Sequence, residues 1–435
     1  MKILLLSSPD PTKTSGMVAF DIYQGLKRIK GNEVKLIVRD WGKYDDSNII
    51  PLETVSRARR KKLFLKVKYR LIRHKIIKIP APKTDPDYHV LDVNQTASPF
   101  KTKKILRKAG FVPDAIIVLF IQNLLSLKNI YELGQITDAG IFMLLMDMAP
   151  FTAACGYAWD CMGYQQKCGN CPALYSRNRA DQSHFNWEFK KKFIDKTAIH
   201  VIAATEWQIP QIRASSLLGG KPISKVLLPV DSRVFKPANK RALRATLGIP
   251  VQKKIIFFGS VELKHRRKGL HYLLESLKIL DETIKGTALE NNILLLIAGR
   301  GIDDILSRLH FRHHYMGFLH SPESMATAYQ AADVFVCPSV EDAGPTMINQ
   351  SIMCGTPVVS FEMGVAADLV HTGETGYRAK LADSVDLARG IHAILAMKTI
   401  SYLDMSQNCR RLAMDSYDSA VTAEKIQQLI SPYQK

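Results

Sequence analysis

The sequence has no run of the roughly 20 consecutive apolar residues that a membrane-spanning helix requires. Its first residues, MKILLLSSPDP, also hold too short an apolar stretch for the core of a secretion signal. Residues Ile3 to Ser7 are better interpreted as a first buried strand that runs into a loop. We therefore expect a cytoplasmic protein.

Acidic residues are scarce relative to basic ones, with 40 Asp and Glu against 60 Lys and Arg, a net charge of +20. Such an excess implies an anionic partner, which is a phosphorylated substrate, a membrane surface or nucleic acid. Between Arg57 and Lys78 there are 11 basic residues, no acidic residue and several interleaved apolar ones. This pattern suits a segment that lies on an anionic membrane face, although a solvated basic helix or loop has the same composition. No nucleic-acid-binding motif accompanies the charge, so nucleic acid is not expected.

An Asp-x-Asp motif in a convincing metal-site context is also missing. Asp85-Pro86-Asp87 matches the motif but lies in a polar loop. A catalytic metal is therefore not expected, and no cofactor is required for catalysis.

Cysteine is present at seven positions, and four of the cysteines follow the pattern C-x5-C-x6-C-x2-C: Cys155, Cys161, Cys168 and Cys171. Four thiolates are a ligand set for a closed, structural zinc site. Packed free thiols are the alternative, and disulfides are rare in the cytoplasm. We predict a structural zinc here.

Short apolar runs alternate with helix-like segments along the whole chain, a pattern typical of βαβ units with buried parallel strands. One helix is predicted just after residue 269, because Leu270, Leu273, Leu274, Leu277 and Leu280 recur at helical spacing. The predicted strands are residues 3–6, 34–38, 116–120, 141–145, 201–204, 255–258, 293–298, 334–337 and 358–361.

The stretch from Leu228 to Pro237 contains two prolines and no regular period, so we interpret it as an interdomain linker. The prediction is an α/β protein of two doubly wound, Rossmann-like domains that face a central cleft. Residues 1–228 form the first domain and residues 237–414 the second. A last helical stretch, 415–435, packs back on the first domain.

Two segments of the second half suit a nucleotide diphosphate. The predicted strand 255–258 ends at Gly259 and Ser260, and the cation-rich run from Lys264 to Gly269 follows directly before the leucine-faced helix. Cations and a helix N-terminus stabilise phosphate, although a solvated basic turn would look the same.

The other segment runs from Pro338 to Thr346 and again follows an apolar strand. Gly344 and Pro345 predict a helix start there, with proline at the first helical position, and Gly355 predicts its end. Glu341 and Asp342 precede this helix and are placed to accept hydrogen bonds from sugar hydroxyls. Gln350, about two turns in, is placed to reach a ribose.

These residues together resemble family 4 glycosyltransferases, which are retaining enzymes of the GT-B fold. The motifs that carry the resemblance are Gly259, Lys268-Gly269, Ala298-Gly299-Arg300, Ala331-Ala332-Asp333-Val334, Pro338-Ser339, Glu341, the run from Cys354 to Val359 and the run from Gly373 to Tyr377. The resemblance covers the whole second half and extends more weakly to Ser15-Gly16. The run from Asp147 to Thr152 resembles the subset that builds bacterial envelope polysaccharides.

The resemblance implies a retaining transfer of a hexosyl group from a UDP- or GDP-sugar to a glycan or lipid-linked glycan, at or near the inner membrane face. Its implied catalytic residues are Asp147, Lys268 and Asp342. The implied donor-binding residues are Gly16, Gly259, Ser260, Arg267, Lys268, Gly299, Arg300, Glu341, Asp342, Gly344, Pro345, Thr346 and Gln350.

The chain departs from the family pattern at several positions. Gln350 stands where the second glutamate of the family belongs, and Met146 and Gly156 stand where histidines are usual. These departures support a rival hypothesis, a non-catalytic GT-B protein that binds a nucleotide-sugar or assists a partner enzyme. A sugar-nucleotide epimerase, a phosphorylase and a charge-driven nucleic-acid binder are further alternatives.

Overall fold

A computed structural model describes residues 1–13, 16–40, 42, 44–53, 84–301 and 309–435. The predicted membrane-facing stretch, 57–78, lies outside these residues. The chain forms two compact units. Unit 1 comprises residues 1–202, 211–224 and 424–435, and unit 2 comprises residues 203–210 and 225–423.

Unit 1 is built on a sheet whose described strands run in the order β3-β2-β1-β4-β5-β6-β7. Neighbouring strands from β3 to β5 pair in parallel. The strands are β1 (Lys2–Ser7), β2 (Glu33–Val38), β3 (Ile49–Pro51), β4 (Ala115–Val118), β5 (Gly140–Leu145), β6 (Ile199–Ala203) and β7 (Ile223–Lys225). The helices are α1 (Met17–Arg28), α3 (Thr102–Ala109), α4 (Leu127–Thr137) and α5 (Gln182–Ile194). The helix α6 (Gln208–Ala214) lies across the division, with residues 208–210 in unit 2.

Unit 2 holds a parallel sheet in the order β10-β9-β8-β11-β12-β13. Its strands are β8 (Lys254–Glu262), β9 (Ile293–Arg300), β10 (His313–Tyr315), β11 (Val334–Cys337), β12 (Val358–Phe361) and β13 (Gly376–Ala379). Its helices are α7 (Lys240–Thr246), α8 (Leu270–Ile284), α9 (Pro322–Ala331), α10 (Thr346–Met353), α11 (Ala366–Leu369), α12 (Ser384–Leu395) and α13 (Thr399–Tyr417).

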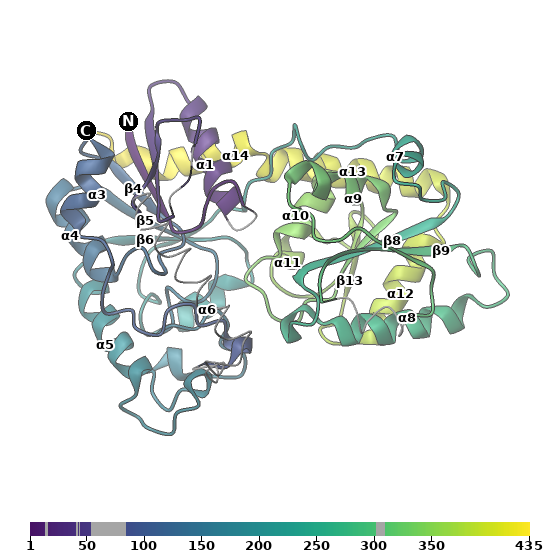
Figure 1. The fold of residues 1–435 in the computed structure, drawn as a ribbon, viewed down its shortest axis with the longest axis horizontal. Coiled ribbons are helices and arrows are strands. Elements are labelled where there is room, and N and C mark those ends of the chain that lie inside the picture. Colours follow the sequence, from purple (N-terminus) through teal and green to yellow (C-terminus); the bar gives the residue numbers. More distant parts are fainter. Residues whose placement is uncertain (14–15, 41, 43, 54–83, 302–308) are drawn as a thin grey trace, which may run out of the picture. The chain divides into compact units, whose positions relative to one another are not determined.

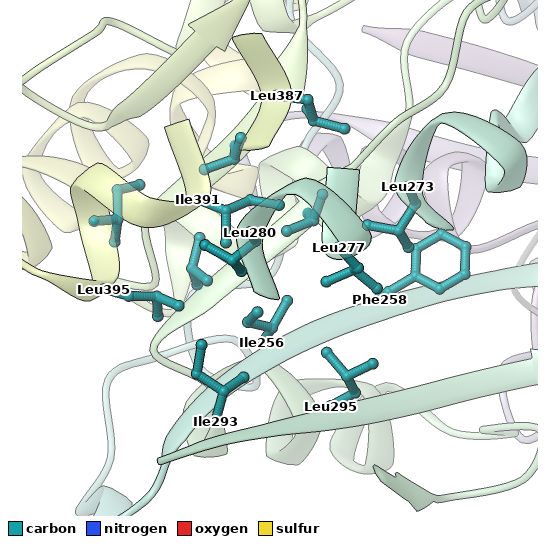
Figure 2. Packing of buried hydrophobic residues seen from close by; sticks show 14 of the residues in the cluster. Ile256, Phe258, Leu273, Leu277, Leu280, Ile293, Leu295, Leu387, Ile391 and Leu395 are labelled. Carbon is teal, nitrogen blue, oxygen red and sulfur yellow. The ribbon is translucent and has the colours of Figure 1, made fainter. Parts of the chain in front are cut away.

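The core of unit 2 shows why its helices form where they do. Leu273, Leu277 and Leu280 of α8 are at most 3% exposed and pack with α12 against β8 and β9 (Figure 2). Each buried leucine contributes about 1.5–3 kcal/mol relative to an exposed one. The helical period read from the sequence is therefore the period of this buried face.

The connections differ in their bounds from the prediction at two places. The presumed linker from Leu228 to Pro237 is packed into unit 2, because Leu228, Val230 and Phe235 are at most 4% exposed and hold it there. The last helical stretch is divided, since α13 ends at Tyr417 and α14 (Ser419–Ile430) follows after an extended Asp418. Of this stretch, residues 424–435 pack on unit 1, as predicted. There Asn32 Nδ2 donates to Gln427 Oε1 at 2.8 Å. The C-terminal end of the chain, in yellow, lies next to the N-terminal segment, in purple (Figure 1).

Candidate functional site

In unit 2 the order in which the chain adds strands to the sheet reverses at β8. From β8 the chain proceeds outward to β9 and β10 on one side and then returns to β11 on the other side. The loops that follow β8 and β11 therefore leave the sheet in opposite directions from neighbouring strand ends. Ligands of open α/β sheets bind at such a switch point.

The strand β8 is longer than predicted. Gly259 and Ser260 do not end it but pair with Ala298 and Gly299 of β9, and the strand continues past a bulge to Glu262. A Cβ at position 259 would lie 3.2 Å from the Ala298 carbonyl oxygen. A Cβ at position 299, where φ is +137°, would lie 2.0 Å from the Ser260 carbonyl oxygen. These glycines thus allow two backbones to approach closely, which is what prolongs the strand pair.

The cation-rich loop after β8 is joined to the loop after β11. Arg266–Lys268 form a 3-10 turn, and Gly269 follows at φ +64° as the N-cap of α8. A Cβ on Gly269 would lie 1.8 Å from the Pro338 carbonyl oxygen, and Val340 N donates to Arg267 O at 2.8 Å. The cations are therefore held next to the segment that carries Asp342.

Asp342 is the centre of this arrangement. One of its oxygens, Oδ2, accepts from Arg267 Nη1 at 2.5 Å and from Lys268 Nζ at 2.6 Å, and the other, Oδ1, accepts from Gly344 N at 3.3 Å. Burial alone would raise the pKa of this carboxyl, but Lys268 and Arg267 outweigh it and hold the pKa far below its usual range. The carboxylate predicted to hold a sugar is thus an ion-pair partner of both cations predicted to hold a diphosphate.

The helix α10 begins and ends close to the predicted positions. Pro345 is its N-cap, with an extended ψ of 101°, rather than its first helical residue. The helix ends at Met353, and Gly355 follows in the left-handed region at φ +72°.

Gln350 has a partner that the sequence did not indicate. Its Oε1 accepts from the hydroxyl of Tyr329 at 3.1 Å, and Tyr329 is fully buried in α9. This contact fixes the orientation of the amide, because the carbonyl oxygen faces the tyrosine. A tyrosine in an otherwise alanine-rich helix was the only signal, and it does not reveal which residue it contacts.

The remaining donor candidates lie around the same strand ends. Arg300 is the last residue of β9 and lies over the ring of Phe318, 4.2 Å from its centroid. Thr346 is the first residue of α10 and is half-buried, as is Glu341 in the loop before it. Gly16, by contrast, belongs to unit 1, where it is the buried N-cap of α1. Ser15 lies outside the described residues.

Unit 1 has its own switch point, between β1 and β4. Ser7 ends β1, Gln122 follows β4, and Asp147 follows β5. All three are at most 7% exposed, and neither Ser7 Oγ nor Gln122 Oε1 has a hydrogen-bond partner among the described residues. Buried polar atoms without a partner are rare in native structures, so a water molecule or a ligand group is expected to satisfy these two.

Asp147 is held in this group by two donors. Its Oδ1 accepts from Ala149 N at 3.0 Å, and its Oδ2 accepts from Gln122 Nε2 at 3.5 Å. The hydrogen bond from Ala149 is also the one expected of a carboxylate that only caps its loop. A catalytic role for Asp147 therefore stays a prediction.

His89 lies close to position 156, which the sequence did not indicate. A Cβ at Gly156 would lie 3.3 Å from His89 Cδ2 and 3.5 Å from Asp147 Oδ2. A side chain at position 156 would therefore contact both the imidazole and the Asp147 carboxylate. No local motif could reveal this, because His89 and Gly156 are far apart in the sequence.

The four clustered cysteines lie together. Cys155, Cys161, Cys168 and Cys171 are half-buried free thiols that line one cavity. Burial raises the pKa of Cys155 to about 12 and that of Cys168 to about 11. In the described part of the chain no three Cys, His, Asp or Glu side chains are arranged to hold a metal ion as they stand, so zinc stays a prediction.

None of the helices in the described ranges is both long enough and apolar enough to span a membrane.

Comparisons with known proteins bear on both units. Residues 252–397 match the family described as glycosyl transferases, group 1. The D-inositol 3-phosphate glycosyltransferase of Arthrobacter sp. strain FB24 is 30% identical over 179 residues, which are 38% of this chain and 40% of the relative. The enzyme of the same name from Geodermatophilus obscurus is 29% identical over 233 residues, 47% of this chain and 48% of the relative. The chain spans less than half the length of these curated relatives.

Solved structures match over nearly the whole chain. Sucrose-phosphate synthase from Thermosynechococcus elongatus has a TM-score of 0.65 at 17% identity and covers 99% of this chain and 98% of its own. The Anabaena protein HepE, in complex with UDP and glucose, has a TM-score of 0.62 at 17% identity, with coverage of 99% and 100%. WaaG, described as a glycosyltransferase involved in lipopolysaccharide biosynthesis, has a TM-score of 0.59 at 14% identity, with coverage of 99% and 100%. The predicted GT-B fold is thereby confirmed.

Proposed function

We propose that this chain, whose residues 252–397 belong to the group 1 glycosyltransferases, is an enzyme that transfers a sugar from a nucleotide-sugar donor. The observation that carries the proposal is the meeting of Arg267, Lys268 and Asp342 where β8 and β11 end. A leaving nucleoside diphosphate needs preorganised cations, and the transferred sugar needs a hydrogen-bond acceptor beside it. This site offers both.

The ion pairs of Asp342 suggest how the site responds to a donor. A diphosphate that reaches Lys268 and Arg267 competes with Asp342 for their N–H groups. The carboxylate oxygens then become available to the sugar hydroxyls, with Glu341 beside them. Lys268 and Arg267 would stabilise the negative charge that develops as the diphosphate leaves, which is an electrostatic form of catalysis.

Gln350 is proposed to bind the ribose through its amide group. Its Oε1 already accepts from Tyr329 at 3.1 Å, so the amide nitrogen is the half of the group that faces away from this buried ring. A ribose hydroxyl can both donate and accept, so the amide N–H of glutamine can donate to it where a carboxylate would accept from it. Gln350 in place of the family's glutamate is therefore compatible with nucleotide binding.

The finer features of the proposal follow the family resemblance. The transfer would retain the anomeric configuration and proceed without a catalytic metal. The acceptor would be a glycan or lipid-linked glycan of a surface polysaccharide, with Asp147 on the acceptor side. The basic stretch 57–78 would bring the enzyme to the inner face of the membrane that holds such an acceptor.

The test begins with donor binding. Isothermal calorimetry with UDP, GDP and their glucose and mannose derivatives should identify one nucleotide that binds. Lys268→Ala should weaken that binding about tenfold or more, since a charge-assisted hydrogen bond contributes about 1.5–3 kcal/mol. Lys278→Ala is the control, because Lys278 is an exposed lysine on the same helix α8.

The second step measures transfer of radiolabelled sugar to lipid-linked acceptors, with and without added Mg²⁺ or Mn²⁺. Label in the lipid fraction, independent of the added ions, is the expected result. Donor binding with no transfer to any acceptor would instead favour the non-catalytic nucleotide-sugar-binding protein. Failure of all nucleotides to bind would overturn the proposal itself.

A further inference from the structure

The cavity lined by the four cysteines is small and mostly non-polar. Its volume is about 30 Å³, and its other walls include Ala153, Ala154, Ala158 and Leu174. On the same measure one water molecule needs roughly 10–15 Å³. The cavity therefore has room for a single metal ion or a water molecule.

The backbone around the cysteines is fixed by neighbouring side chains. Thr152 Oγ1 donates to Cys155 O at 2.8 Å, and Asp181, the N-cap of α5, accepts from Cys171 N at 2.8 Å. His184 Nδ1 lies 3.1 Å from Cys168 O. These contacts hold three of the cysteines around the cavity and leave the orientation of each thiol to rotation about one side-chain bond.

A buried lysine adjoins the cluster. Lys190 of α5 is 1% exposed, and its Nζ donates to Ala149 O at 2.7 Å and to Thr152 O at 2.9 Å. Within the described residues it forms no ion pair with a carboxylate. Thr152, whose carbonyl oxygen accepts from Nζ, also donates through Oγ1 to Cys155 O, so the ammonium group lies next to the segment that carries the first cysteine. A buried cation is costly unless a negative charge compensates it.

We propose that Cys155, Cys161, Cys168 and Cys171 bind one zinc ion as thiolates, with Lys190 as the buried counter-cation of the site. Four thiols release four protons when they bind Zn²⁺, which leaves a complex of net charge −2. The ammonium group of Lys190 offsets half of that charge. Tetrahedral sulfur ligands favour zinc among the common metals.

Binding requires the four thiols to turn toward the centre of the cavity. With all four positions filled by sulfur, the site has no place for a water and its role is structural. It would tie the N-terminal end of α5 to the segment after β5, in which Asp147 lies. The proposal does not depend on glycosyl transfer.

The first test is elemental analysis of the full-length protein purified without chelators. About one equivalent of zinc is expected per chain. Replacement by Co²⁺ should give the absorption bands of tetrahedral thiolate coordination. The Cys168→Ser, Cys171→Ser double variant should lose the metal, whereas Cys337→Ser, a change in a buried thiol of unit 2, should retain it.

The role of Lys190 is tested by metal affinity. Lys190→Met should lower zinc affinity about tenfold to 100-fold in competition with a chromophoric chelator, the range seen for outer-shell residues of metal sites. Lys191→Met is the matched control, since Lys191 is partly exposed and pairs with Asp195 at 2.7 Å. Equal zinc affinity of the parent and Lys190→Met would overturn the proposed role of Lys190 as counter-cation.

Less than about 0.2 equivalents of zinc in the parent, with four titratable thiols in the cluster, would overturn the metal site. Iron in place of zinc would also overturn it. So would an intact mass that is lower by two or four hydrogens, which signals one or two disulfides.

Discussion

At the scale of single residues, Asp342 decides how the two cations are arranged. Because both Arg267 and Lys268 contact one buried oxygen, removal of the negative charge removes the carboxylate that the two cations share. We expect Asp342→Asn to lower the free energy of unfolding by about 3 kcal/mol at pH 7, the scale of a broken buried ion pair. Urea unfolding measures this loss, and Asp404→Asn, an exposed change of the same charge in α13, should have little effect.

The pH dependence of the same pair has a defined sign. The folded-state pKa of Asp342 is depressed, so its contribution is complete above the pKa of the unfolded state, about 4. The contribution is lost as the pH falls below that value toward the folded-state pKa. The stability difference between parent and Asp342→Asn should therefore be constant from pH 5 to 8 and shrink below pH 4. A difference that grew on acidification would contradict the ion-pair assignment.

Sequence motifs name the candidate residues of the site but not the contacts between them. Lys268, Asp342 and Gln350 were singled out by motif. Their contacts with each other and with Tyr329 depend on which loops the sheet brings together, and a linear pattern does not contain that information.

At the scale of elements, Gly269 joins the start of α8 to the loop after β11. We expect Gly269→Ala to lower stability by at least about 2 kcal/mol, because alanine is strained at φ +64° and its Cβ would lie 1.8 Å from the Pro338 carbonyl oxygen. Thermal unfolding checks the loss, and nucleotide binding should weaken as the cation loop moves.

Gly286→Ala is the matched control for that experiment. Gly286 has a similar φ of +72°, but nothing lies within 4 Å of the Cβ it would gain. The free energy of unfolding of Gly286→Ala should fall only by the cost of holding alanine in the left-handed conformation, about 1 kcal/mol. Equal losses at the two positions would show that the close approach to Pro338 contributes nothing.

The strands illustrate what a sequence pattern can predict at this scale. All nine apolar runs correspond to strands. The four described strands that no apolar run indicated are β3, β7, β10 and β13, and these are the edges of the two sheets. An edge strand has a neighbour on one side only and need not be apolar, as His313–Tyr315 shows, so hydrophobic runs fail to mark it.

At the scale of the whole molecule, the end of the chain completes unit 1. Ile426 and Ile430 are fully buried, and the rings of Tyr433 and Phe142 of β5 meet edge to face, 5.3 Å between centroids. We expect Ile430→Ala to destabilise unit 1 by about 2–5 kcal/mol, the range for truncation of a buried isoleucine.

Hydrogen exchange resolved by peptide distinguishes the units. In Ile430→Ala the amides of β1, β2 and β5 should exchange faster, and those of β8, β9 and β11 should be unchanged. Leu403→Ala is the control, because Leu403 is 53% exposed on α13. Faster exchange throughout both units would mean that they unfold as one.

Sequence patterns predict the fold class, the buried strands, the leucine face of α8 and the residues of the candidate donor site. These features follow from local periodicity and from short motifs, which each segment carries independently of the others. Three features appear only in the folded chain: β8 continues past Gly259, the predicted linker is packed into unit 2, and His89 and Asp147 both border position 156. The physical reason is the same in each case: strand length, burial of a loop and proximity of distant side chains depend on which backbones can approach closely, and that is a property of the packed chain.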